Sequence, residues 1–119
     1  MQLTLNQERA NFALQKVRSI ISDKDKFATN AKRLPALITT NGLIPTLAFL
    51  KSKGETKPVY DTINEWLKQR GFKKENKDVL EYLLECDFST LRLATMEAMA
   101  FANWLKRMVE IELKEKNNE

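Results

Sequence analysis

Glycine and proline, the residues that most often end helices, occur only three times each in this chain of 119 residues. Between these positions the apolar residues recur about every 3.6 residues, as on one face of an α-helix, whereas a strand would show a period of two. The sequence therefore predicts an all-α fold: a compact bundle of about five to six helices with a long C-terminal helix and no sheet.

Length and composition favour a single helical domain over residues 1–119, with residues 113–119 as a frayed polar tail. A chain of this length, 43% hydrophobic, buries enough apolar surface to fold without a metal ion or a disulfide. Cys86 is the single cysteine, so no intramolecular disulfide can form and no cysteine cluster can bind zinc. Charged residues interrupt the first positions, and no apolar run reaches the roughly 20 residues of a membrane span. We therefore expect a cytoplasmic protein without membrane contact.

The first half of the chain contains clear signals for helix ends. Thr4 and Gln7 have the spacing of a capping box, which predicts a first helix over residues 5–22. A second helix is expected to begin near Asp25. Pro35 predicts a kink or break in it, because proline removes a backbone donor and disfavours helical geometry at the preceding residue.

Asn41-Gly42 can end a helix, because glycine adopts a positive φ without strain. The same pair is also favoured in hairpin turns, so the flanking apolar segments could be read as two strands. Pro45 argues against a strand, since proline removes a hydrogen bond of the sheet but is favoured in the first turn of a helix. The remaining helices are expected over residues 44–53, 58–71, 77–86 and 90–116, with Asp87 or Ser89 capping the last.

The stretch from Thr90 to Lys116 contains no glycine or proline, which predicts a helix on the order of 40 Å long at about 1.5 Å per residue. Its first half is apolar on nearly every side, so we expect other helices or a partner subunit to surround it. Its second half, after Lys106, is charged and is expected to project. The methionines of this stretch are interpreted as core residues: Met96, Met99 and Met108.

Histidine is absent, which removes the commonest general base and the commonest metal ligand. Three scattered glycines cannot build a phosphate-binding loop, so no nucleotide cofactor is expected. Glu81 and Glu85 could bind a metal ion as the site of a metal-dependent nuclease, but their position opposite the apolar helix face is typical of solvated glutamates. We therefore expect a protein that is not an enzyme, with no catalytic residue, cofactor, metal or small-molecule substrate.

Positive charge is concentrated in the first half of the chain. Residues 1–60 contain ten lysines and arginines against four acidic residues, whereas residues 61–119 contain ten against twelve. Many basic residues gather before Pro35, around Gly54 and around Gly71, where helix ends and loops carry them outward. Such groups suit contact with nucleic-acid phosphates or an acidic protein, and they are equally compatible with a solvated surface.

Arg92 and Lys106-Arg107 differ from the other basic residues because they interrupt the most apolar helix. They could form a buried ion pair with Glu97 or Glu110. Otherwise they must extend out of the core or face an acidic partner.

Three stretches together resemble one known family. The first is Glu8-Arg9-Ala10 with Phe12-Ala13-Leu14, the second leads from Leu34-Pro35-Ala36 through Thr40-Asn41-Gly42-Leu43 to Thr46-Leu47-Ala48-Phe49, and the third runs from Arg92-Leu93-Ala94-Thr95 through Glu97-Ala98 to Trp104-Leu105-Lys106-Arg107. In this order they are similar to the small α-helical subunit of the type III-B CRISPR effector, the Cmr RAMP module. The resemblance covers nearly the whole chain, but residues 53–58 and 71–77 take no part in it.

The resemblance implies a compact helical bundle without enzymatic activity in a ribonucleoprotein of antiviral defence. It implies packing beside the backbone RAMP subunit, which carries the guide RNA, and beside neighbouring copies of the chain itself. It also implies basic side chains along the channel that holds the guide–target RNA duplex, where base pairing reads the sequence. RNA cleavage would belong to another subunit.

We therefore expect a structural subunit of this effector that contacts guide and target RNA. The candidates for phosphate contact are Lys32, Arg33, Lys51, Lys53, Arg92, Lys106 and Arg107. The alternative is a protein-only helical adaptor without direct RNA contact, in which the long last helix docks on a partner and the lysines serve only solubility.

Overall fold

The computed structural model describes residues 2–113, and within that range it contains six α-helices and no strand. The helices are α1 (Leu5–Ser19), α2 (Lys24–Asn41), α3 (Leu43–Ser52), α4 (Lys57–Gln69), α5 (Val79–Glu85) and α6 (Phe88–Glu112). The expected all-α bundle with a long C-terminal helix is confirmed for this part of the chain. Of the expected polar tail 113–119, all but Leu113 lies outside the described residues.

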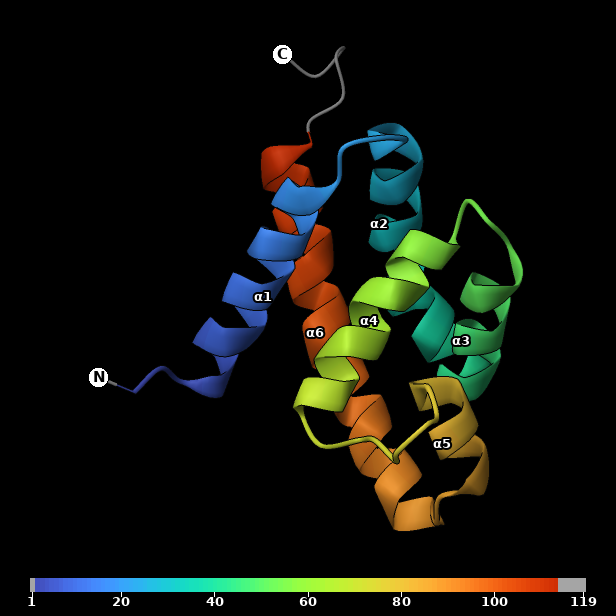
Figure 1. Cartoon of the computed structure of the whole chain (residues 1–119). Coiled ribbons are helices and arrows are strands. Elements are labelled where there is room, and N and C mark those ends of the chain that lie inside the picture. The colour runs from blue at the N-terminus through green and yellow to red at the C-terminus, as the bar shows by residue number, and fades with distance from the viewer. Residues whose placement is uncertain (1, 114–119) are drawn as a thin grey trace.

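Helix α6 is the central element, and α1, α2 and α4 all pack against it (Figure 1). Helix α3 packs on α2, α4 and α5 instead. Residues buried at three- and four-residue spacing continue far along α6, and both Leu105 and Val109 are fully buried. Arg18 Nε also donates to Glu112 Oε1 at 2.5 Å. The prediction that the second half of this helix projects is therefore wrong, because α1 and α2 cover it.

Local signals set the helix ends as the sequence indicated. Gln7 N donates to Thr4 Oγ1 at 3.1 Å and Thr4 N donates to Gln7 Oε1 at 2.8 Å, which confirms the capping box of α1. Helix α1 ends at Ser19, three residues before the expected end, because Ile20 is extended. Asp87 caps α6 by accepting from Thr90 N at 2.8 Å.

Helix α2 continues through Pro35 from Lys24 to Asn41, so the expected break is absent. Leu34 and Ile38 are buried on either side of Pro35, and their packing in the core keeps the chain helical there. Gly42 then separates α2 from α3 with a φ of 87°. Asn41-Gly42 thus joins two helices, and the hairpin reading is excluded.

The core draws buried residues from all six helices, among them Leu34, Ile63, Trp66, Phe101 and Leu105. Two of the three methionines expected there pack against it while partly buried: Met99 and Met108. Met96 is 58% exposed, so its interpretation as a core residue is wrong. No neighbouring helix in the described part of the chain covers that face of α6.

Candidate functional site

Arg9 and Glu97 form a nearly buried ion pair between α1 and α6. Arg9 Nε donates to Glu97 Oε2 at 2.7 Å, and Arg9 Nη2 donates to Glu97 Oε1 at 2.8 Å. Trp66 Nε1 on α4 donates to Glu97 Oε2 at 2.9 Å, so three helices meet at one carboxylate. The side chains of Arg9 and Glu97 are only 16% and 10% exposed.

The charges of this cluster stabilise one another. Burial alone would raise the pKa of Glu97, but hydrogen bonds from Arg9 and Trp66 and the charge of Arg9 together lower it below its ordinary value. The hydrogen bond to Glu97 raises the pKa of Arg9. Both carboxylate oxygens of Glu97 accept hydrogen bonds from within the bundle, so the ion pair holds the helices together.

The partner of Glu97 was not predicted. Arg92 and Lys106-Arg107 were considered for this ion pair, but the carboxylate binds Arg9, which is 88 residues distant in the sequence. Spacing along a helix cannot reveal a pair between the first and last helices. The available signal was that Arg9 and Glu97 both belong to the stretches that carry the family resemblance.

Asp78 joins the end of α3 and the first turn of α4 to the start of α5. Tyr60 Oη donates to Asp78 Oδ2 at 2.5 Å, Lys51 Nζ donates to the same oxygen at 2.6 Å, and Glu81 N donates to Oδ1 at 3.0 Å. Burial tends to raise the pKa of Asp78, but these hydrogen bonds outweigh it and bring the pKa well below its usual range. The candidate Lys51 therefore already neutralises a carboxylate of the chain.

Two further candidates also have contacts within the chain. Lys53 Nζ lies 5.1 Å from the ring centroid of Phe49, at the distance of a cation–π contact. Arg107 Nη1 donates to Glu110 Oε1 at 3.1 Å in an exposed pair one turn along α6. Of the two ion pairs considered for the basic residues of α6, only this surface pair is present, and it is not buried.

The other four candidates lie on α2 and α6. Lys32 is half-buried, whereas Arg33, Arg92 and Lys106 are exposed. Arg92 and Lys106 are 14 residues apart on one helix, so roughly 21 Å separates their positions along its axis. The candidates on α6 are therefore spread along the helix rather than gathered at one point.

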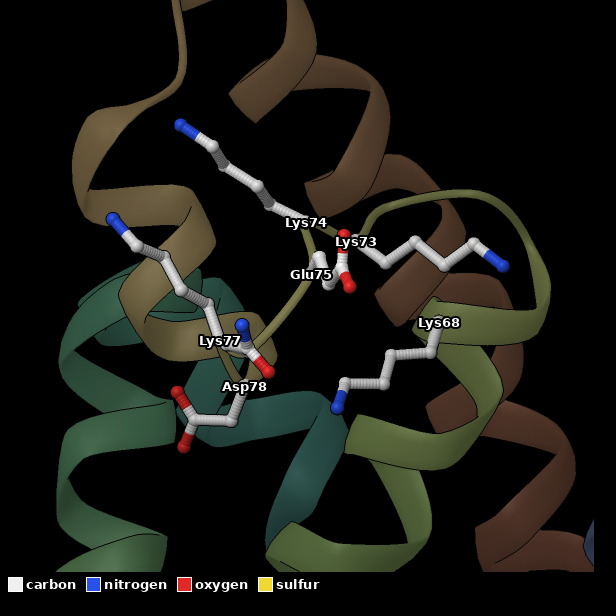
Figure 2. A pocket seen from close by; sticks show the side chains of 7 residues that line it. Lys68, Lys73, Lys74, Glu75, Lys77 and Asp78 are labelled. Carbon is white, nitrogen blue, oxygen red and sulfur yellow. The ribbon is translucent and has the colours of Figure 1, made fainter.

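A lysine-rich hollow of about 670 Å³ lies between the end of α4 and the start of α5. Figure 2 shows its side chains, which come from α4, from the connecting loop and from the start of α5. The lining residues are Lys68, Lys73, Lys74, Glu75, Asn76, Lys77 and Asp78. None of these lysines was among the seven candidates, although the basic group around Gly71 was visible in the sequence.

Smaller hollows adjoin two of the candidates. Arg33 lines one of about 320 Å³ with Lys26 and Glu55 among its other residues, so opposite charges meet there. Arg107 lines one of about 230 Å³ with Asn103 and Trp104. The first hollow therefore mixes charges of both signs, and the second contains a single cation.

Four large apolar side chains are exposed on α5 and the first half of α6, and we call them the apolar surface. They are Leu84, Phe88, Leu93 and Met96, which are 65%, 78%, 55% and 58% exposed. Leu93 and Met96 lie one turn apart on α6. Contiguous exposed apolar side chains mark interaction surfaces, and Leu93 and Met96 have the spacing of neighbours on one helix face.

The glutamates considered for a metal site have structural partners. Glu81 completes the capping box of α5 with Asp78, and Lys77 Nζ donates to Glu85. Residues 2–113 contain no group of three or more acidic or cysteine side chains arranged to hold a metal ion. None of the helices described is long and apolar enough to cross a membrane.

A family model described as CRISPR-associated protein (Cas_Cmr5) matches residues 5–112, a range that spans all six helices. The chain belongs to the Cmr5 family. A Cmr5 relative from Thermotoga maritima, a CRISPR system Cmr subunit, is 33% identical over 98% of this chain and 90% of its own length. The crystal structure of a CRISPR-associated Cmr5 family protein from Thermus thermophilus covers 92% of this chain and 97% of its own, with 26% identity and a TM-score of 0.78.

Membership of the Cmr5 family confirms the resemblance inferred from the sequence. It makes the chain a subunit of the multi-subunit CRISPR Cmr complex, with other Cmr subunits as its partners. In this Cmr5 bundle two of the recognised stretches are in direct contact. Arg9 belongs to the first and Glu97 to the third, and their ion pair joins the helices that carry them.

Proposed function

We propose that this Cmr5 chain is a non-catalytic structural subunit of a cytoplasmic type III-B effector. It packs beside the backbone RAMP subunit and neighbouring copies of itself, and it helps hold the guide–target RNA duplex in antiviral defence. Family membership supports the assembly, and exposed cations on α2 and α6 support the RNA contact. Because base pairing reads the target in a guided effector, this subunit needs to supply only shape and positive charge.

Exposed cations without an internal partner are the observation that carries the RNA contact. Arg33, Arg92 and Lys106 are exposed, and none forms an ion pair with another residue in the range 2–113. Phosphate would have to compete with a carboxylate of the chain for Lys51 and Arg107. Exposed cations without an ion pair bind phosphate by releasing counterions, which gives affinity without reading the base sequence.

The test changes Arg33, Arg92 and Lys106 together to glutamine and measures target-RNA binding by the reconstituted effector between about 50 and 200 mM salt. Each phosphate contact contributes roughly 0.7–0.9 to the slope of log affinity against log salt concentration. Losing three contacts should therefore lower the slope by about 2–3. Across this fourfold change in salt, wild type should lose roughly 20- to 40-fold more affinity than the variant.

A control changes Lys16, Lys24 and Lys57 to glutamine, which removes the same charge from exposed or half-buried positions outside the candidate set. Lys16 and Lys57 pair with Glu65 and Asp61, so the control removes two paired cations and one exposed lysine, Lys24. This control variant should keep the wild-type slope. If the first variant assembles normally and also keeps that slope, its three residues do not contact RNA and the proposal is contradicted.

The apolar surface favours a second function, a protein-only adaptor without RNA contact. Changing Leu93 and Met96 to glutamine would then abolish assembly with the other Cmr subunits when RNA is absent, as gel filtration would show. Normal assembly of this variant would exclude the apolar surface as the docking site. The adaptor function also requires that the salt slope be unchanged in the variant of Arg33, Arg92 and Lys106.

A further inference from the structure

We propose that the lysine-rich hollow between α4 and α5 is a second RNA-binding site, at which Lys68, Lys73 and Lys74 hold the phosphate backbone of an RNA strand. This inference rests on the proposed function, because it requires RNA in the assembly. It adds a site outside the seven candidate residues. Most of the hollow also lies outside the stretches that resemble the family, since residues 71–77 carry none of that resemblance.

The first half of the loop has a fixed backbone. Gly71 has a φ of 96°, and its N–H donates to Lys68 O at 3.0 Å. Phe72 N donates to Leu67 O at 3.0 Å, which completes the pair of hydrogen bonds in a Schellman motif. Phe72 is partly buried against the core, so it anchors the loop where it leaves α4.

The second half is held as well. Lys77 N donates to Lys74 O at 3.1 Å, which closes a turn, and Asn76 within that turn has a φ of 66°. Asp78 follows as the N-cap of α5 and is fixed by Lys51 and by the capping box. A backbone held at both ends loses less conformational freedom on binding than a flexible basic segment would.

The charges that line the hollow are not balanced internally. Four lysines face two carboxylates, Glu75 and Asp78. Asp78 is neutralised by Lys51, which lies outside the hollow, and Lys77 donates to Glu85. Three lysines remain without an ion pair in the described part of the chain, with Glu75 as the only opposing charge in the lining: Lys68, Lys73 and Lys74.

The chemistry of the lining fits phosphate better than bases. It contains no aromatic side chain for stacking and no arginine for bidentate recognition. Lysine ammonium groups are compact point charges that bind phosphate oxygens without a fixed geometry. In Figure 2, Lys73 and Lys74 extend from the loop in opposite directions, as suits a charged strand that passes over the loop better than a single carboxylate.

The test changes Lys68, Lys73 and Lys74 to glutamine and measures RNA binding by the reconstituted effector over the same salt range. Loss of three contacts to a single strand lowers the salt slope by about 2, so wild type should lose roughly 20-fold more affinity across the range than the variant. The control that changes Lys16, Lys24 and Lys57 applies here unchanged. An unchanged slope in the assembled Lys68/Lys73/Lys74 variant overturns the inference.

Lysine acetylation followed by mass spectrometry tests the site without any substitution. Acetylation is compared in the isolated chain, the protein-only assembly and the complete ribonucleoprotein. We expect Lys68, Lys73 and Lys74 to become protected from acetylation only in the ribonucleoprotein. Lys57, which lies outside the hollow, is the reference against which their acetylation is compared. Protection that is already present in the protein-only assembly would show that a protein covers the hollow, and absence of protection would show that nothing does; either result overturns the inference.

The two proposals can fail separately. If the variant of Arg33, Arg92 and Lys106 lowers the salt slope while the variant of the hollow does not, the second site is wrong and the proposed function stands. If only the variant of the hollow lowers the slope, RNA contact stands but its assignment to α2 and α6 is wrong. If neither does, both assignments are wrong.

Discussion

Changing Glu97 to alanine should destabilise the bundle by about 3 kcal/mol. Glu97 accepts two hydrogen bonds from Arg9 and one from Trp66, so its removal leaves a guanidinium and an indole N–H without their partner. Breaking one side of a buried ion pair typically costs about 3–5 kcal/mol. The lower end applies here, because Arg9 is 16% exposed and water can solvate part of the released guanidinium.

Thermal unfolding followed by far-UV circular dichroism measures this effect. For a chain of this size 1 kcal/mol corresponds to roughly 3–5 °C, so the Tm of Glu97→Ala should fall by about 10–15 °C. Glu110→Ala is the control, since Glu110 lies on the same helix and, within residues 2–113, accepts only from Arg107 in an exposed pair worth about 0.5 kcal/mol or less. If the two variants had the same Tm, Glu97 would not join the helices as described.

Gly42 combines a φ of 87° with a ψ of 166°, so Gly42→Ala should lower the free energy of unfolding in urea by about 1–3 kcal/mol. Gly54→Ala, where an added Cβ meets nothing within 4 Å, should change it by less than about 1 kcal/mol. Leu105→Ala removes a fully buried side chain and should cost about 2–5 kcal/mol in the same assay. Folding lowers the pKa of Glu97 and Asp78 from ordinary values of 4.5 and 3.8, so their stabilisation is present above those values and is lost as pH falls through the folded values. The urea midpoint should therefore fall as the solution is acidified below about pH 4.5, and less steeply for Asp78→Asn; equal slopes would contradict the role given to Asp78.

Local signals predicted most of the fold. The capping box at Thr4, the glycine between α2 and α3 and the cap at Asp87 act over a few residues, so they can be read from the sequence directly. Pro35 shows the limit of such signals. Its preference against a helix interior is real, but the buried residues on either side keep α2 continuous.

The errors concern contacts between distant segments. The charged second half of α6 has the composition of a projecting helix, yet α1 and α2 pack against α6 and Val109 is fully buried. Met96 is an apolar residue in an apolar segment, as is typical of the core, yet no described helix covers it. Which face of an apolar helix remains open depends on how many neighbours pack around it, and periodicity does not give that number.

The candidate site was predicted only at the level of charge. The sequence showed where lysines and arginines lie and offered Glu110 as a partner for Lys106-Arg107, but it could not show that Asp78 binds Lys51. The pairing of Asp78 with Lys51 depends on tertiary geometry. For the same reason the hollow around Lys73 was missed, because the turn and the Schellman motif that shape it involve main-chain bonds within the loop.

Isolation of the tagged chain from its host, with identification of the bound proteins and RNA, tests most directly whether it works within a ribonucleoprotein. We expect the other Cmr subunits and a guide RNA to elute with it as one complex in gel filtration. Elution of the chain alone, or with protein partners but without any RNA, would contradict a role in holding a guide–target duplex.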